Sequence, residues 1–209
     1  MGTINKKENN DRGVTVWLTG LPFSGKKETA KILADRLHLL GFKAQILVGG
    51  ELRRLFDNNL GFSREEVFKN IKRIAYECKL LTENGIIAIA VTISPFRDQR
   101  EECRKMIGRF VEVYNKCPME ILKKKDKKGL FKKAEEKKIK NVAGIDIPYE
   151  EAENPELIIE CKDETPTDAA IKIILKLQEL GFLEGADRSV LFKQEEKDIR
   201  EILRKTWFK

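Results

Sequence analysis

The residues best suited to chemistry lie near the start of the chain. They form the segment GLPFSGKK from Gly20 to Lys27, whose other members are Leu21, Pro22, Phe23, Ser24, Gly25 and Lys26. The first seven residues match G-x-x-x-x-G-K, in which glycines let backbone N–H groups surround phosphates and the lysine adds positive charge. The motif continues with Ser or Thr, whose hydroxyl binds Mg²⁺, but this chain has Lys27 there. The segment predicts a phosphate-binding loop without its usual metal ligand, and the alternative is an ordinary tight glycine turn.

The elements on both sides of this loop fit the prediction. Val14, Val16 and Leu18 alternate with other residues as in a strand, and residues 28–40 carry apolar side chains at helical spacing. A strand, a loop and a helix N-terminus in this order direct the first-turn amides and the helix dipole toward a phosphate.

The rest of the chain predicts an α/β fold. Further strands are expected over 43–48, 86–93, 110–114 and 157–160, and helices over 51–56, 63–84 and 167–180. Ser63 and Glu66 form a capping box at the start of the long helix. Ile86 to Ile93 is almost entirely apolar, which is typical of a central parallel strand covered on both faces. We expect a mainly parallel sheet flanked by helices on both faces, with ligands at the carboxyl ends of its strands.

Composition limits the protein class. The 209 residues fit one α/β domain, and 41 basic against 34 acidic residues give a net charge of +7 that suits anionic partners. The four cysteines contain no C-x-x-C pair, so neither a zinc site nor a disulfide framework is expected, and no metal site is predicted. The longest apolar run is too short to span a membrane, and the N-terminus lacks an apolar signal segment. These features predict a cytoplasmic protein without membrane association.

The predicted domain boundaries leave two flanking segments. Residues 1–12 are expected to be a flexible lead-in, 13–182 the α/β domain and 183–209 a C-terminal helical extension. The extension contains a predicted helix from about Lys193, which either packs on its own domain or docks on another chain.

Several segments together resemble adenylylsulfate kinases over about Gly13 to Phe182. They are TVWLTGLPFSGKK, LGFSREEVFKNIKRIA, ISPFRDQR, KDKKGLFKKA, IKNVAGIDIPYE and NPELIIE. The resemblance implies a P-loop kinase fold with a lid segment over Lys128 to Tyr149. It also implies transfer of the ATP γ-phosphoryl group to the 3′-hydroxyl of adenylylsulfate, which makes 3′-phosphoadenylylsulfate in sulfate activation, and it implies a homodimer.

The same resemblance suggests which residues bind the two nucleotides. The loop from Gly20 to Lys27 would hold the ATP phosphates. The residues that would hold or border adenylylsulfate are Arg53, Phe62, Asn70, Ile93, Ser94 and Lys128. An arginine fork suits phosphate or sulfate oxygens, and an aromatic ring can lie against adenine. Phe62 has an alternative as a core residue before a helix cap.

This chain departs from the family pattern at the positions that bind the metal ion and the reacting hydroxyl group. Lys27 replaces the hydroxyl, and Leu47-Val48-Gly49-Gly50 stands where the family has Leu-Asp-Gly-Asp, so Val48 and Gly50 remove two carboxylates. Glu51 is one residue late, and Val67 replaces an arginine that contacts the substrate. Losing such groups predicts weak catalysis, since each is worth about 10²-fold or more in rate. Lys26 is retained, no residue is assigned as catalytic, and Mg²⁺ is required only if the protein is active.

Two alternatives remain. The first is a catalytically inactive regulatory or partner subunit that senses adenylylsulfate or 3′-phosphoadenylylsulfate, similar to the domain at the C-terminus of fungal ATP sulfurylases. ATP sulfurylase is then a candidate partner. The second is a nucleic-acid surface over the lysine-rich residues 123–140, but the interleaved acidic residues and the fit to the lid favour a segment facing nucleotide phosphates.

Overall fold

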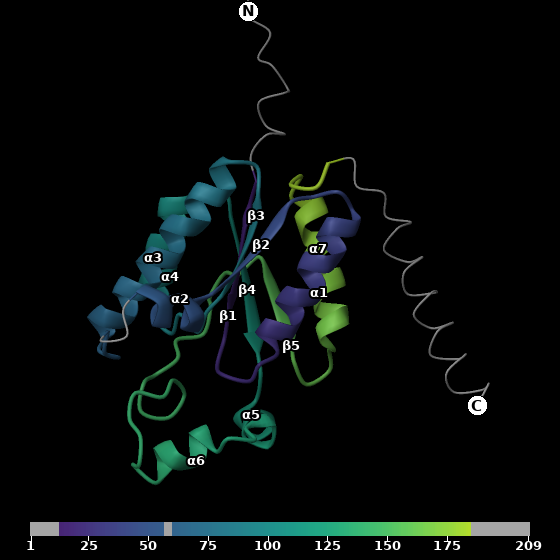
Figure 1. Ribbon diagram of the computed structural model, residues 1–209. Coiled ribbons are helices and arrows are strands. Elements are labelled where there is room, and N and C mark those ends of the chain that lie inside the picture. Colours follow the sequence, from purple (N-terminus) through teal and green to yellow (C-terminus); the bar gives the residue numbers. More distant parts are fainter. Residues whose placement is uncertain (1–12, 57–59, 185–209) are drawn as a thin grey trace, which may run out of the picture.

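The computed structural model describes residues 13–56 and 60–184. Five parallel strands form one sheet in the order β2-β3-β1-β4-β5, and helices cover both of its faces (Figure 1). The mainly parallel α/β fold predicted from the sequence is therefore confirmed. In chain order the elements are β1 (Thr15–Thr19), α1 (Lys26–Leu39), β2 (Ala44–Val48), α2 (Gly49–Phe56), α3 (Arg64–Glu83), β3 (Ile87–Val91), α4 (Arg97–Ile107), β4 (Phe110–Lys116), α5 (Met119–Lys125), α6 (Leu130–Glu135), β5 (Leu157–Glu160) and α7 (Pro166–Glu179).

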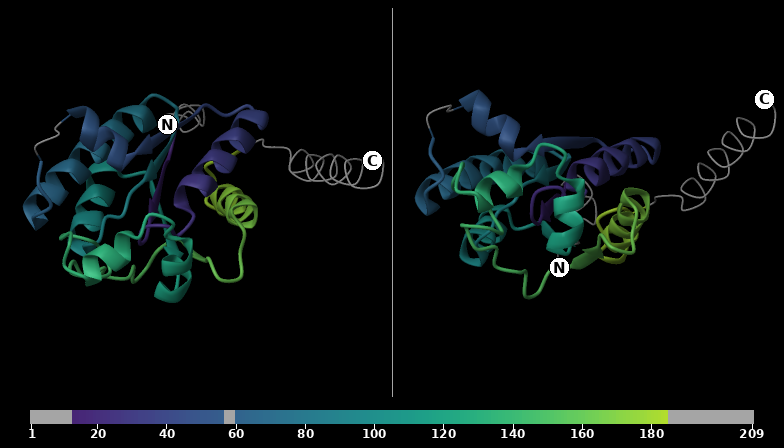
Figure 2. Two further views of the ribbon diagram at one scale, coloured as in Figure 1. Left: turned by 60° about the horizontal axis from the view of Figure 1, so that its bottom comes forward. Right: turned by 90° about the horizontal axis from the view of Figure 1, so that it is seen from below.

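The centre of the sheet is buried on both sides. Every residue of β1 and β3 is buried, because α1 and α7 pack on one face and α3 and α4 on the other (Figure 2). Leu33 and Ile173 belong to the core on the first face, and Ile74 and Cys103 to the core on the second. A strand covered on both faces has no solvent-facing side, which explains the unbroken apolar run of β3.

Local signals set some helix boundaries but not all. The predicted capping box is present, since Ser63 accepts a hydrogen bond from the Glu66 amide and the Glu66 carboxylate accepts one from the Ser63 amide. The sequence did not predict α4, α5 or α6 as helices. The α4 segment is mostly polar, and it buries Arg100 against Glu112 of β4 instead of presenting a wide apolar stripe.

The predicted lid segment, Lys128 to Tyr149, packs together with the residues before it, so from here on we call Met119 to Tyr149 the lid. The lid lies over the carboxyl ends of the strands (Figures 1 and 2). The lid has a small core of its own that includes Leu122 and Phe131. Phe23 of the predicted phosphate loop packs edge-on against Phe131, with ring centroids 5.6 Å apart. The lid and the loop are therefore one packed unit.

Some sequence predictions lie outside the described residues. These are the lead-in over 1–12 and the helix expected from about Lys193. Within residues 13–56 and 60–184, no helix is both long and apolar enough to cross a membrane.

Candidate functional site: a phosphate loop beside a nucleoside-sized cavity

The loop between β1 and α1 has the backbone shape of an anion site. Gly20 and Gly25 have φ angles of 141° and 87°, which an L side chain rarely adopts. A Cβ atom on Gly20 would also lie 2.6 Å from the Asn115 carbonyl oxygen. Gly25 offers no side chain to cap α1, so the first amides of this 14-residue helix keep their donors for a ligand. The predicted loop is thus formed at the N-terminus of a helix.

Lys26 is almost fully buried in the loop. Its Nζ donates hydrogen bonds to the carbonyl oxygens of Gly20 (2.8 Å) and Leu21 (2.7 Å) and to Ser24 Oγ (3.0 Å). Burial lowers the pKa of Lys26 to about 7, since an ammonium loses hydration there and only Glu28 opposes the effect. A phosphate would stabilise the charged form, so anion binding and protonation of Lys26 favour each other.

A cavity of about 270 Å³ lies beside the loop and brings most of the predicted substrate residues together. Its lining includes Lys26 together with Arg53, Phe62, Asn70, Ile93 and Ser94, which come from α1, α2, α3 and the segments next to α3 and β3. Gly50 and Val67, two of the positions that depart from the family pattern, also line it. Among the described residues that form this lining there is no Asp, Glu or His. The cavity therefore offers apolar and cationic contacts but no carboxylate or imidazole side chain.

Arg53 and Phe62 form the outer wall of this cavity. The Arg53 guanidinium lies 4.0 Å from the centroid of the Phe62 ring and donates to the carbonyl oxygens of Leu60 and Gly61. Phe62 is 50% exposed, so the alternative of a core residue is wrong. An exposed ring at a cavity mouth, backed by a cation, can stack on a planar base.

The side chains of Asn70 and Ser94 both form hydrogen bonds within the protein, with different partners. Asn70 Nδ2 donates to the Gly49 carbonyl oxygen (3.3 Å), which ties α3 to the start of α2. Ser94 Oγ accepts hydrogen bonds from Trp17 Nε1 (3.1 Å) and Thr92 Oγ1 (2.8 Å), and it donates to Thr19 Oγ1 (2.9 Å). The Ser94 hydroxyl is buried and fully used within the protein, so this residue shapes the cavity floor through its backbone.

Lys128 is the predicted residue that the structure does not bring to the cavity. It is exposed in the turn between α5 and α6 and lines neither this cavity nor the larger one described below. The neighbouring lysines of the lid partly pair with acids, for example Lys123 with Glu135 at 2.5 Å.

The side chains at the metal position do not fit Mg²⁺. Lys27 Nζ lies 2.5 Å from Glu51 Oε1, and this ion pair spans the starts of α1 and α2. An ammonium cannot ligate a cation, and Val48 and Gly50 offer no side-chain oxygen. Among the described residues, no three His, Cys, Asp or Glu side chains gather closely enough to hold a metal ion. The hydrogen bond from Lys27 also lowers the pKa of Glu51, which makes this carboxylate a weaker base.

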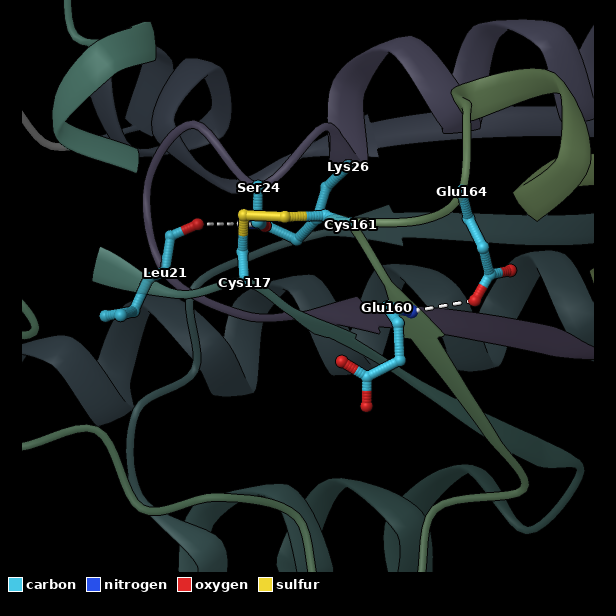
Figure 3. Close-up of a disulfide and its surroundings, with 7 residues drawn as sticks. All are labelled: Leu21, Ser24, Lys26, Cys117, Glu160, Cys161 and Glu164. Atoms are coloured by element: carbon cyan, nitrogen blue, oxygen red, sulfur yellow. Dashed lines mark hydrogen bonds between the residues drawn. A yellow bond between two sulfur atoms is a disulfide. The ribbon is translucent and has the colours of Figure 1, made fainter. Parts of the chain in front are cut away.

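One expectation about cysteines is wrong. Cys117 and Cys161 form a disulfide with Cα atoms 5.1 Å apart, beside Ser24 and Lys26 of the loop (Figure 3). The spacing of the cysteines in the sequence does not predict this pair. The pairing follows from the register of β4 and β5, which places residues 44 apart in the sequence side by side, such as Lys116 and Glu160. The cysteines are the next two residues in that register. Cys117 also lines a second cavity, of about 530 Å³, between the lid and the ends of β4 and β5.

Comparison with known proteins gives consistent matches over this region. The family model for adenylylsulphate kinase matches residues 12–160. An adenylyl-sulfate kinase from Rippkaea orientalis is 44% identical over 174 residues, which are 82% of this chain and 95% of the relative. A probable bifunctional SAT/APS kinase 2 from Sorangium cellulosum is 41% identical over 82% of this chain and 29% of its own length. The structure of the Mycobacterium tuberculosis APS kinase CysC in complex with AMPPNP and APS is similar, with a TM-score of 0.77, 33% identity and coverage of 80% of this chain and 98% of that one.

Proposed function

Because the chain belongs to the adenylylsulphate kinase family, we propose that it binds ATP and adenylylsulfate and transfers the γ-phosphoryl group slowly. The ATP phosphates bind at the loop from Gly20 to Lys27, and adenylylsulfate binds in the 270 Å³ cavity. The 3′-oxygen forms a bond to the γ-phosphorus while the bond to the β–γ bridging oxygen breaks, and the products are ADP, 3′-phosphoadenylylsulfate and a proton. The observation that carries this proposal is the cavity itself, which opens next to Lys26 and gathers five of the predicted substrate residues.

Two features support a low rate. The cavity lining contains no Asp, Glu or His to accept the hydroxyl proton. Glu51 is held by Lys27, and its lowered pKa reduces its basicity. A positioned general base typically contributes about 10² to 10⁴-fold in rate, so turnover at least about 10²-fold below that of ordinary relatives is expected.

A second candidate is a nucleotide-binding subunit without catalysis, which would sense adenylylsulfate or 3′-phosphoadenylylsulfate. The Lys27–Glu51 ion pair favours it, because this pair leaves the phosphate loop formed while it removes the metal ligand. ATP sulfurylase is the proposed partner, since a relative named as a bifunctional SAT/APS kinase carries a similar region within a longer chain. We place either form in the cytoplasm, as a homodimer.

A turnover assay with ATP, Mg²⁺ and adenylylsulfate separates these candidates. The variant Lys27→Ser/Val48→Asp/Gly50→Asp should raise turnover by about tenfold or more, because it returns a hydroxyl to the loop and two carboxylates to the junction of β2 and α2. Wild-type turnover within about tenfold of an ordinary adenylylsulfate kinase would refute the low rate. Calorimetry should show saturable adenylylsulfate binding, and binding without any turnover would select the regulatory subunit. A protein that binds neither nucleotide would contradict both candidates.

A further inference from the structure

The ion pair at the start of α1 points to an unusual way of neutralising phosphates. Lys27 is the second residue of α1, and Glu51 is the third residue of α2. Their charged atoms are 2.5 Å apart, yet each side chain remains 52% exposed. The two side chains are therefore paired with each other and still open to a ligand.

The position of the Lys27–Glu51 pair next to the phosphate loop is what suggests a role in binding. The residue after the loop lysine is where the phosphate-loop motif puts the hydroxyl that binds Mg²⁺. Here that residue carries its own positive charge at the end of a flexible stem. Gly50, beside Glu51, lines the 270 Å³ cavity, so the pair lies at the border between the loop and that cavity.

A divalent cation at this position would find one carboxylate, that of Glu51, which is already paired with Lys27. The Lys27 ammonium repels it, and neither Val48 at the end of β2 nor Gly50 at the start of α2 supplies a side-chain oxygen ligand. Glu51 already accepts the Lys27 hydrogen bond. An ammonium has three N–H donors, and Glu51 takes one of them, which leaves two for phosphate oxygens.

We propose that the Lys27 ammonium, held in place by Glu51, takes the role of the divalent cation, so that the loop binds a nucleoside triphosphate in its metal-free form. The ligand class is thus ATP without Mg²⁺ rather than the MgATP complex. Since this assignment depends on the nucleotide binding proposed above, its test must separate loss of binding from a change in metal dependence.

Isothermal titration calorimetry with ATP provides that test, in excess EDTA and in excess MgCl₂ at equal ionic strength. The wild-type protein should bind ATP at least as tightly in EDTA as in Mg²⁺. Lys27→Met should weaken binding in EDTA by about tenfold or more, which corresponds to about 1.4 kcal/mol. Lys27→Ser should reverse the preference and bind more tightly when Mg²⁺ is present.

Lys43→Met is the matched control, because it removes the same charge at the opposite end of the sheet from the loop. Lys43 is exposed immediately before β2, so this variant should bind ATP within about twofold of wild type. Wild-type binding that tightens tenfold or more with Mg²⁺ would overturn the inference and leave the proposed function standing. Equal weakening in Lys27→Met and Lys43→Met would also overturn it. No ATP binding by the wild type in either buffer would refute the proposed function itself.

Discussion

Reducing the bond between Cys117 and Cys161 should destabilise the protein by a predictable amount. The bond closes a loop of 44 residues, which contains the lid and β5. In the chain-entropy model a loop of this length gives about 4 kcal/mol, and measured disulfides typically contribute about 2–4 kcal/mol. For a chain of this size, each kcal/mol corresponds to about 2–4 °C in Tm. Reduction should therefore lower Tm by about 4–16 °C.

Thermal unfolding followed by circular dichroism, with and without dithiothreitol, measures this shift. The variant Cys117→Ser/Cys161→Ser is the control, and its Tm should not respond to the reductant. The other two cysteines, Cys78 and Cys103, are buried as free thiols, and burial raises the pKa of Cys103 to about 12. They should remain protonated and unreactive in the folded protein.

The result that would refute this reasoning is specific. Mass spectrometry must first show that dithiothreitol has opened the bond between Cys117 and Cys161. If the bond is open and Tm is unchanged, the bond does not constrain the unfolded chain as calculated. If the untreated protein already has four free thiols, the pairing described here is wrong.

Four further predictions concern Arg100, Lys26 and Phe62. Arg100→Met removes the shorter of the two arginine contacts of the buried Glu112 (2.7 Å, against 3.4 Å to Arg104) and should cost up to about 3–5 kcal/mol in urea unfolding, and a loss below about 1 kcal/mol would contradict this. Because the pKa of Lys26 is about 7 in the folded protein against 10.5 unfolded, stability without nucleotide should rise with pH between these values. ATP binding at pH 8 should also take up about one proton, measured by calorimetry in two buffers, and Lys26→Arg should abolish that uptake. Phe62→Ala should weaken adenylylsulfate binding by about 1–3 kcal/mol, whereas Tyr76→Ala, another exposed aromatic change, should leave it unaltered.

The features that could be predicted from the sequence are those encoded by neighbouring residues. Glycine spacing gives the loop from Gly20 to Lys26, and the Ser63 capping box gives the start of α3. The apolar run of β3 reports burial on both faces of the sheet. In each case the cause and its effect lie within a few residues of one another.

The features that were missed depend on distant partners. The Cys117–Cys161 bond requires the register between β4 and β5, which no local pattern contains. The polar helix α4 is stabilised by a buried ion pair between Arg100 and a neighbouring strand. The resemblance assigns Lys128 to adenylylsulfate, and this stays a prediction, since in the structure its side chain is exposed in the turn between α5 and α6.

The residues that stabilise the shape of the site are different from those that depart from the family pattern. Arg100 donates to Glu112 (2.7 Å) and to the carbonyl oxygens of Ser94 (2.7 Å) and Glu150 (2.9 Å), so one buried side chain joins β4, the cavity floor and the end of the lid. Tyr149 adds a contact of 2.9 Å between its hydroxyl and that of Thr19.

Of the substituted positions, Val48 and Val67 pack against the two cores, whereas Lys27 and Gly50 are less constrained by packing. Lys27 and Glu51 are half-exposed, and exposed ion pairs contribute little to stability. Gly50 is exposed, with no neighbouring atom within 4 Å of the place where a Cβ would lie. Residues at these positions can therefore change without disturbing the buried contacts around Arg100. This separation explains how the chain can keep the fold of its family while, as we propose, a lysine takes the place of the metal ion at the phosphates.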